Sequence, residues 1–588
     1  MRRLITLTHV IAIVVIAIVI FSLWTPLASA GHGSAGNSRM KHIPGGDYVT
    51  ISGTILDSHK EPIGEAAVEI SVNGHDMALE KSAHNGQYVI EFMIEDGTME
   101  TASIGIEVQK TSFKTKRTDI KGNKFAKEGK HYLTSKTFSL ERVLDSAFWV
   151  TTIVFILAYA LISFELLHRT LAAMIGAAVL MCLSYTIGTI NPALRIFSFE
   201  QAIGAIDMNV IFLLMGMMII VGVLKNTGVF QWFAYIAYKF ARGNVFILTI
   251  LLMVFTAISS AFLDNVTTML LLTGVAIEIA VSCKLNPIYL LIPLVLASNV
   301  GGTATLIGDP PNIMIGSYAG LSFMHFVFAL ALVCVVGLII LFIYTKLVWG
   351  RDYAKSQELV GDVEEFTAQL KEKYKIYDHV LLTYGLIILG FTVFLFLTHG
   401  YWHMEVSVAA LTGASILLSV GIVTKKVDLL HLFEKDIEWP TLMFFIFLFI
   451  LVGAVEETGL LALIADKIMD LSGGNLLIAM TLILWVSAIM SSFVDNIPFT
   501  ATMLPIVAYL SKEILPGGEN TLWWALALGA CFGGNGTIIG ASANVVTMGI
   551  AESQGYKISF LGFMKTAFPY MLISIALCQV WLMIFKPA

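Results

Sequence analysis

The sequence predicts a polytopic α-helical membrane protein with two inverted repeats, each of five spans plus a re-entrant hairpin, and an N-terminal extracytoplasmic β-sandwich domain. The first observation is composition: 57% of the 588 residues are hydrophobic, 13% are charged, and the mean hydropathy is +0.81. A soluble particle of this size needs more polar surface. The second observation is an internal duplication of the apolar part. The third is a change of composition near residue 145, which separates a β-like segment from the apolar remainder.

The N-terminus has the features of an export signal. Arg2 and Arg3 precede an apolar run over residues 4–24, and the small residues at 28–30 form a cleavage pattern. We expect residues 1–30 to be a signal peptide or, because the run is long enough to span a bilayer, a signal anchor. Both alternatives place the next residues outside the cytoplasm.

Residues 31–145 have the pattern of a soluble β domain. Polar and apolar side chains alternate over 49–57 and 67–72, and turn residues follow each segment. The stretch from Gly53 to Val68 resembles the carboxypeptidase regulatory-like domain, which implies a β-sandwich. Its histidines lack ligand spacing, so we interpret the domain as a passive extracytoplasmic module.

The apolar part contains a duplication. Residues 146–349 and 379–588 form the two repeats, and a charged cytoplasmic linker at 350–378 joins them. With a shift of 231 residues, 257–265 aligns with 488–496 and includes an Asp-Asn pair in each repeat. Apolar composition alone does not produce ordered identities between polar residues.

Further identities follow at a shift of 232 residues. Gly301-Gly302 aligns with Gly533-Gly534, and Asn312 aligns with Asn544. Since each repeat holds an odd number of spans, the repeats have opposite orientation, and the lysines of the linker agree with the positive-inside rule. Inverted repeats with interrupted helices are typical of secondary transporters with a binding site near the bilayer midplane.

Candidate ligands lie where the helices are predicted to break. Asp264-Asn265 and Asp495-Asn496 place a carboxylate beside an amide at each hairpin tip, and such oxygens suit a transient Na⁺ or, on the carboxylate, a proton. A carboxylate in hydrocarbon costs at least ~2.5 kcal/mol, so both tips must line a protein-walled cavity. The predicted sodium-type ligands are Asp264, Asn265, Asp495 and Asn496. The predicted ion- or substrate-binding residues are Asp264, Asn265, Thr267, Asn299, Gly301, Gly302, Thr303, Asp309, Asp495, Asn496, Thr500, Gly533, Gly534, Asn535 and Thr537.

Structural roles are the alternatives for several of these residues. Each tip aspartate could instead cap a helix N-terminus. Asp309 aligns with Ala541 in the second repeat, so it is either a ligand of the first repeat or a cap. For charged residues at span ends, we expect Glu278 to pair near Lys284, and Lys225, Glu456 and Glu457 to reach the membrane interface.

Residues 259–268 and 299–312 resemble the ion transporter superfamily. This superfamily includes arsenite-antimonite pump membrane proteins, the pigmentation P protein, NhaD-type sodium/proton antiporters and divalent-anion:sodium symporters. The resemblance implies a transporter that contains a citrate transporter-like or ArsB-like domain and works as a homodimer by an elevator movement. The symporters carry Ser-Asn-Thr at each tip, whereas this chain carries Asp264-Asn265-Val266 and Asp495-Asn496-Ile497. The added carboxylates favour a cation or proton over a dicarboxylate.

The predicted function is ion-coupled secondary transport, with cation/proton antiport as the first hypothesis. An arsenite or di- or tricarboxylate transporter on the same fold is the alternative, and a channel or membrane sensor is the alternative from another class. The membrane part lacks HExxH, GxSxG and P-loop motifs, so we do not expect an enzyme. No cofactor is expected beyond a transported or coupling Na⁺ or H⁺.

The expected partners are the lipid bilayer and a small inorganic ion or small anion. No Lys/Arg-rich arm is present, which excludes a nucleic-acid-binding function. We therefore place the protein in the cell membrane as a multi-pass protein.

Overall fold

The computed structural model describes residues 46–57, 60–83, 85–164, 166–191, 194–359, 363–515 and 517–585, so the predicted export segment lies outside the described residues. The chain forms two compact units. The first runs to Ile156 and adds Ala178–Ala202 and Gly453–Leu460, and the second comprises the rest. The described part contains 11 helices long and apolar enough to cross a membrane. Together with the N-terminal strands, these helices confirm the predicted fold class.

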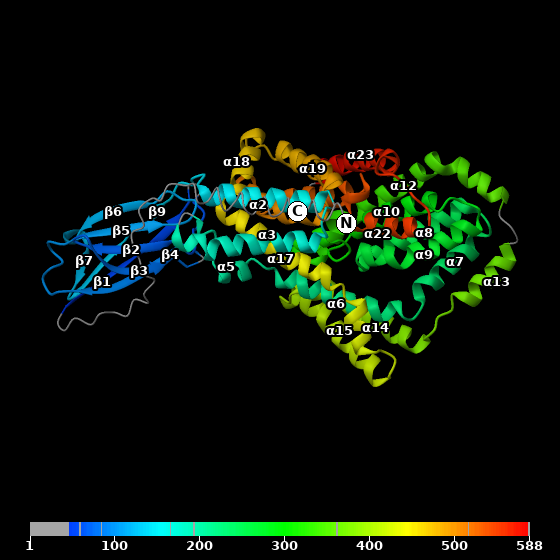
Figure 1. Cartoon of the computed structure of the whole chain (residues 1–588), viewed down its shortest axis with the longest axis horizontal. Coiled ribbons are helices and arrows are strands. Elements are labelled where there is room, and N and C mark those ends of the chain that lie inside the picture. The colour runs from blue at the N-terminus through cyan, green and yellow to red at the C-terminus, as the bar shows by residue number, and fades with distance from the viewer. Residues whose placement is uncertain are drawn as a thin grey trace. The chain divides into compact units, whose positions relative to one another are not determined.

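The N-terminal domain is a β-sandwich of two sheets, drawn in blue in Figure 1. One sheet has the order β4-β1-β8-β7, with β9 also paired to β1, and the other has the order β3-β2-β5-β6. Side chains of both sheets share one hydrophobic core. The strands are β1 (Asp47–Leu56), β2 (Ala67–Val72), β3 (His75–Lys81), β4 (Gln87–Ile94), β5 (Ser103–Gln109), β6 (Lys116–Lys121), β7 (Ala126–Glu128), β8 (His131–Ser135) and β9 (Phe138–Ser139).

Packing explains the pattern that identified this domain. A Cβ atom on Gly53 would lie 1.9 Å from the carbonyl oxygen of Lys136, so only glycine allows this approach of the two chain segments. Ile63 is 6% exposed, and Val68 is fully buried in the core. The spaced glycine and apolar residues are therefore requirements of the sandwich.

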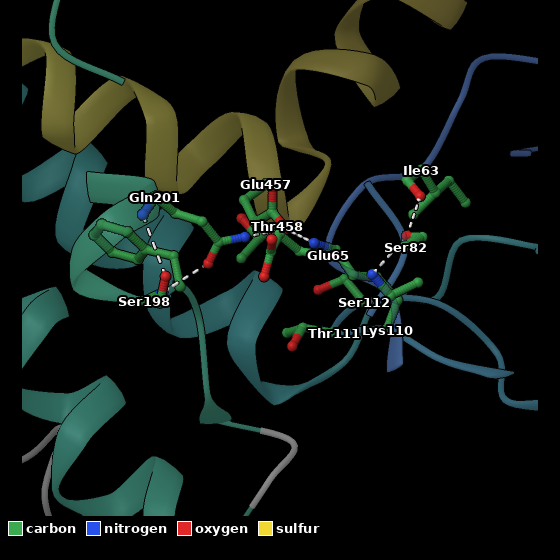
Figure 2. A network of polar contacts seen from close by, with 12 residues as sticks. Ile63, Glu65, Ser82, Lys110, Thr111, Ser112, Ser198, Gln201, Glu457 and Thr458 are labelled. Atoms are coloured by element: carbon green, nitrogen blue, oxygen red, sulfur yellow. Dashed lines mark hydrogen bonds and ion pairs between the residues drawn. The ribbon is translucent and has the colours of Figure 1, made fainter. Parts of the chain in front are cut away.

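Polar contacts inside the first unit attach the β-sandwich to segments of the apolar part (Figure 2). Lys110 at the end of β5 pairs with Glu457, which also accepts a 3.4 Å hydrogen bond from Gln201 Nε2. Thr111 Oγ1 donates to the carbonyl oxygen of Arg195 at 2.8 Å. Glu457, which we predicted to reach the membrane interface, thus serves as an attachment point for the β domain.

The helices alternate between long spans and shorter interrupted segments. The first repeat contains α2 (Ser146–Ser163), α3 (Arg169–Tyr185), α4 (Ile187–Ile190), α5 (Phe199–Gly204), α6 (Met208–Lys225), α7 (Val229–Ala241), α8 (Val245–Phe262), α9 (Asn265–Ser282), α10 (Ile288–Thr303), α11 (Pro310–Ala319) and α12 (Phe323–Leu359). Helix α13 (Val363–Lys373) lies in the linker. The second repeat contains α14 (His379–Thr398), α15 (Val406–Val423), α16 (Leu429–His431), α17 (Trp439–Thr458), α18 (Leu460–Ser472), α19 (Leu476–Phe493), α20 (Asn496–Ile514), α21 (Thr521–Gly533), α22 (Ser542–Ser553) and α23 (Phe560–Phe585).

Interrupted helices from both repeats form the centre of the second unit. The hairpins are α8/α9 and α19/α20, and the broken spans are α10/α11 and α21/α22. Each hairpin packs on the broken span of its own repeat, α8 on α10 and α19 on α21. Each also reaches the other repeat, since α9 packs on α22 and α20 packs on α11; α8, α9, α10 and α22 lie together in Figure 1. The two repeats therefore interlock through their interrupted helices.

The outer helices pack in separate groups. Helices α6, α14 and α15 contact one another, and a Cβ on Gly216 of α6 would lie 2.9 Å from the backbone carbon of Ala410 in α15. A Cβ on Gly176 of α3 would lie 3.2 Å from Ala158 in α2 and 3.3 Å from Leu451 in α17. Small residues thus let these helices approach closely, as is usual in membranes.

Two ion pairs differ from the expectation for span ends. Glu278 at the end of α9 pairs with Lys373 of the linker at 2.7 Å, and the predicted partner Lys284 is not the one it contacts. Lys225 at the end of α6 pairs with Asp436 at 3.3 Å. Both charges meet protein partners that are distant in sequence, which hydropathy and charge patterns do not specify.

The predicted topology can be tested by labelling. In a Cys182→Ser background, which removes the one exposed cysteine of the described residues, Glu128→Cys should react with an impermeant maleimide in intact cells. Both Glu128 and Gln369 are exposed side chains, so Gln369→Cys should react only after permeabilisation if the linker is cytoplasmic. The reverse pattern would contradict the predicted orientation of both repeats.

Candidate functional site

Each hairpin turns at an aspartate that caps the second arm. Asp264 Oδ2 accepts hydrogen bonds from the N–H and the hydroxyl of Thr267 at 2.9 and 3.1 Å. Asp495 Oδ1 accepts from the N–H of Ile497 at 3.0 Å. The capping alternative is therefore part of the geometry in both repeats. Both aspartates are half-buried, so capping does not remove them fully from solvent.

Four predicted glycines allow the helices around the tips to approach one another. A Cβ on Gly301 would lie 2.1 Å from the carbonyl oxygen of Ala257 in α8, and one on Gly533 would lie 2.6 Å from that of Ala488 in α19. A Cβ on Gly302 would lie 2.6 Å from the carbonyl oxygen of Gly308, and one on Gly534 would lie 3.0 Å from that of Gly540. These glycines position the breaks and carry no ligand atoms of their own beyond the backbone.

An asparagine in each repeat stabilises the break in the broken span. Asn312 Nδ2 donates to the carbonyl oxygens of Thr303 and Thr305 at 3.0 and 2.8 Å. In the second repeat, Asn544 Nδ2 donates to those of Gly534 and Thr537, both at 2.8 Å. Backbone groups left unpaired in a membrane protein cost several kcal/mol each, so these amides make the breaks possible.

A chain of buried amides crosses the interface between the repeats. Asn265 Nδ2 at the first tip donates to Asn299 Oδ1 at 3.4 Å. Asn299 Nδ2 donates to Asn535 Oδ1 and Asn544 Oδ1, both at 3.0 Å. Asn535 is fully buried, and its Nδ2 has no hydrogen-bond partner in the structure. The series of amide contacts thus ends at Asn535 in a buried donor without a partner.

Asp309 lies opposite the second hairpin tip. It occupies the N-cap position of α11, but its side chain makes no capping hydrogen bond. Both of its carboxylate oxygens lie 3.4 Å from Asn496 Nδ2, and its side chain is only 1% exposed. Asp309 thus does not cap its helix through its side chain, and its carboxylate faces the other repeat.

The second tip also meets a cation. Arg169 at the start of α3 donates to Asp495 Oδ2 at 3.2 Å, and Ser542 Oγ donates to the same oxygen at 2.7 Å. The Arg169 Cζ atom lies 5.3 Å from the centre of the Phe444 ring. These residues border a cavity of about 460 Å³ lined by Ile162, Ser163, Leu167, His168, Arg169, Asp495, Ile539, Ser542, Val545 and Val546.

Predicted threonine ligands have structural hydrogen bonds. The hydroxyls of Thr303 and Thr500 donate to the carbonyl oxygens of Asn299 and Asn496 one turn earlier, both at 2.7 Å. Thr537 donates to the carbonyl oxygen of Ser492, which joins its break to the hairpin. The structure thus brings the predicted acidic and amide residues together, whereas these hydroxyls serve the backbone.

Four residues of this site were not among the predicted site residues. Asn312 and Asn544 were visible as identities between the repeats, and this signal could have placed them among the candidates. Arg169 lies at the end of a span, where a charged residue at the cytoplasmic interface is common. Ser542 lies at the start of a helix, where serine is also common. Nothing in the sequence pairs either of them with Asp495.

Carboxylates dominate the charge of the site. Asp495 pairs with the guanidinium of Arg169, and among the described residues no lysine or arginine forms an ion pair with Asp264 or Asp309. Among the described residues, no three His, Cys, Asp or Glu side chains converge on one position suitable for a metal ion. Any cation bound here would therefore be held by no more than two carboxylates, with amide and backbone oxygens as the other ligands.

Several known proteins are similar in sequence to this chain. A family model described as "Citrate transporter" matches residues 159–529. An uncharacterized transporter of Mycobacterium tuberculosis is 41% identical over 436 residues, which cover 74% of this chain and 97% of that protein. The P protein of Homo sapiens is 35% identical over 499 residues, which cover 72% of this chain and 58% of the P protein. The solved structure of the Alcanivorax borkumensis YdaH transporter covers 70% of this chain and 97% of its own, with a TM-score of 0.42 and 14% identity.

Glycine at position 301 should be necessary for the packing of the site. Gly301→Ala places a methyl group 2.1 Å from a backbone oxygen and should destabilise the protein by about 1–3 kcal/mol. Gly274→Ala is the matched control, since a Cβ there meets nothing within 4 Å. Thermal unfolding in detergent checks this, and equal melting of the two variants would contradict the close approach of α8 and α10.

Proposed function

Because the chain belongs to the citrate transporter family, it is a secondary transporter, and we propose that it exchanges Na⁺ or another small cation for protons. The predicted resemblance to the ion transporter superfamily is confirmed by this membership. Since the family consists of transporters, the prediction that the chain is not an enzyme is also confirmed, and a channel or sensor becomes the weaker hypothesis. The transported species and its coupling are the subject of our proposal.

The placement of carboxylates beside amides at the interface between the repeats carries the proposal. Asp264-Asn265 lies at one tip, and Asn496 at the other tip contacts the buried carboxylate of Asp309. Each carboxylate can hold either a proton or a cation, so the two species compete for the same oxygens. Competition of this kind couples the movement of one ion to that of the other.

The charge balance supports a cation as the transported species. Of the three carboxylates, Asp495 is paired with Arg169, and helix N-termini contribute only about half a positive charge each. A dianion would therefore need additional bound cations to enter the site. A cation needs no such compensation.

We also propose alternating access by an elevator movement in a homodimer. The interrupted helices pack mainly with one another, and α6, α14 and α15 pack mainly with one another, with a smaller contact between α6 and α11; such a division suits a moving part and a scaffold. The molecular mass of the detergent-solubilised protein, measured by light scattering, tests the dimer. A monomeric mass would contradict it.

Anion transport is the second candidate function, and one observation favours it. Arg169 borders the 460 Å³ cavity at the second tip, and a guanidinium is the usual partner of a carboxylate or an oxyanion. The description of the matching family also names citrate. Accumulation of citrate or arsenite without cation-driven proton flux would favour this candidate over ours.

Removing the charge at either tip should nearly abolish exchange. Asp264→Asn and Asp495→Asn keep the side-chain shape but remove a titratable charge, so cation-driven proton flux in vesicles should fall roughly 10- to 100-fold, as for the loss of a charged hydrogen-bond partner. Folding should persist, because a neutral amide is cheaper to bury than a carboxylate. The exposed Asp470→Asn is the control.

The same vesicles test proton competition. Raising the pH frees the carboxylates from protons, so the apparent affinity for Na⁺ or Li⁺ should rise by up to about tenfold per pH unit in wild type. An internal pH dye reports the flux. Wild-type transport and wild-type pH dependence in both variants would mean that the aspartates are only caps.

A further inference from the structure

The two hairpin tips differ in their charged neighbours, although both carry an Asp-Asn pair at the same position of the repeat. Asp495 makes an ion pair with Arg169 at 3.2 Å. Among the residues that the structure describes, the ion pairs include none between Asp264 and a lysine or arginine. The duplication thus supplies two similar aspartates, and the surrounding helices make them unequal.

Arg169 is firmly positioned toward the second tip. Its Nη2 donates to Thr441 Oγ1 of α17 at 3.3 Å, and its guanidinium lies over the Phe444 ring. Its Nη1 contacts both Asp495 and Ser542. The side chains of Arg169 and Asp495 are 23% and 13% exposed, so solvent screens their attraction less than at a free surface.

The contacts of Arg169 also join two groups of helices. Arg169 and Phe444 belong to α3 and α17, which pack together near Gly176. Asp495 and Ser542 belong to the interrupted helices at the centre. A movement of the centre relative to the outer helices must therefore break this ion pair or carry Arg169 with it.

We propose that Arg169 is a built-in counter-cation for Asp495, so that Asp264 takes the transported cation and Asp495 holds Arg169. This inference rests on the proposed cation exchange and assigns different roles to the two tips. An ammonium or metal cation has no need to reach Asp495, because a guanidinium already neutralises it. Arg169 is thus a positioning and specificity residue, which sets how many cations the site accepts.

Charge rescue tests this assignment. Asp495→Asn leaves Arg169 unpaired beside the cavity, where its charge repels the incoming cation, so flux should fall at least roughly tenfold. In Arg169→Gln/Asp495→Asn both charges are gone, and cation-driven proton flux should return to within about threefold of wild type. Arg169→Gln should not rescue Asp264→Asn. A double variant as inactive as Asp495→Asn would overturn the proposal, since Asp495 itself would then be a ligand of the transported cation.

A second measurement does not depend on transport. Val546 lines the cavity, so Val546→Cys in the Cys182→Ser background should react with a maleimide added to inside-out vesicles. The ion pair between Arg169 and Asp495 belongs to the conformation that has this cavity. Arg169→Gln removes the ion pair and should lower the population of that conformation, so the reaction should slow at least roughly threefold, whereas Arg169→Lys should preserve it. Lys426→Gln, which removes the partly exposed pair with Asp378, is the matched control.

The transport assay and the labelling assay together distinguish a failure of the proposed cation exchange from a failure of the proposed role of Arg169. If wild type shows no cation-driven proton flux from pH 6 to 9 while labelling responds to Arg169→Gln, the proposed exchange fails and the ion pair between the helix groups stands. If labelling is the same in wild type and Arg169→Gln, the role of Arg169 is overturned, whatever the transport assay gives.

Discussion

Polar groups that lipid cannot solvate must be satisfied by the protein itself, and this constraint governs the centre of the structure. The hairpins and broken spans leave helix ends, carbonyl oxygens and carboxylates inside an apolar chain. The aspartates at the tips satisfy N–H groups of their own helices, and Asn312 and Asn544 satisfy carbonyl oxygens at the breaks. The amide nitrogen of Asn535, where the repeats meet, is one of the buried polar atoms left without a partner.

Much of this arrangement could be predicted from the sequence because the two repeats still share identical residues at corresponding positions. Two copies of Asp-Asn and of Gly-Gly at a nearly constant spacing locate the tips and the breaks, and apolar lengths locate the spans. The β-sandwich could be predicted because the alternation of polar and apolar residues along a strand is a local pattern. Glycine is required at position 53 because a Cβ there would clash with the backbone, and any chain with this packing has the same requirement.

Partners across the structure could not be predicted in this way. An alignment of repeats shows which positions correspond, but it does not show that the second tip faces Asp309 of the first repeat. Arg169, Lys225 and Glu457 resemble charges that reach the membrane interface, yet each meets an opposite charge distant in sequence. Hydropathy and the positive-inside rule predict where a residue lies relative to the bilayer, but they do not predict which residues of other helices it contacts.

The interlock of the repeats has a consequence for biogenesis. Asp309 leaves the ribosome long before Asn496, and Asn299 long before Asn535 and Asn544, although each depends on the later residue for its hydrogen bond. A nascent chain that contains only the first repeat would hold unmatched polar groups within the bilayer for the whole interval. Synthesis proceeds at about 5–20 residues per second, so this interval lasts roughly ten seconds or more. During that time the insertion machinery or a chaperone must shield the half-built core, and mutations at the interlock should act first on the yield of membrane insertion.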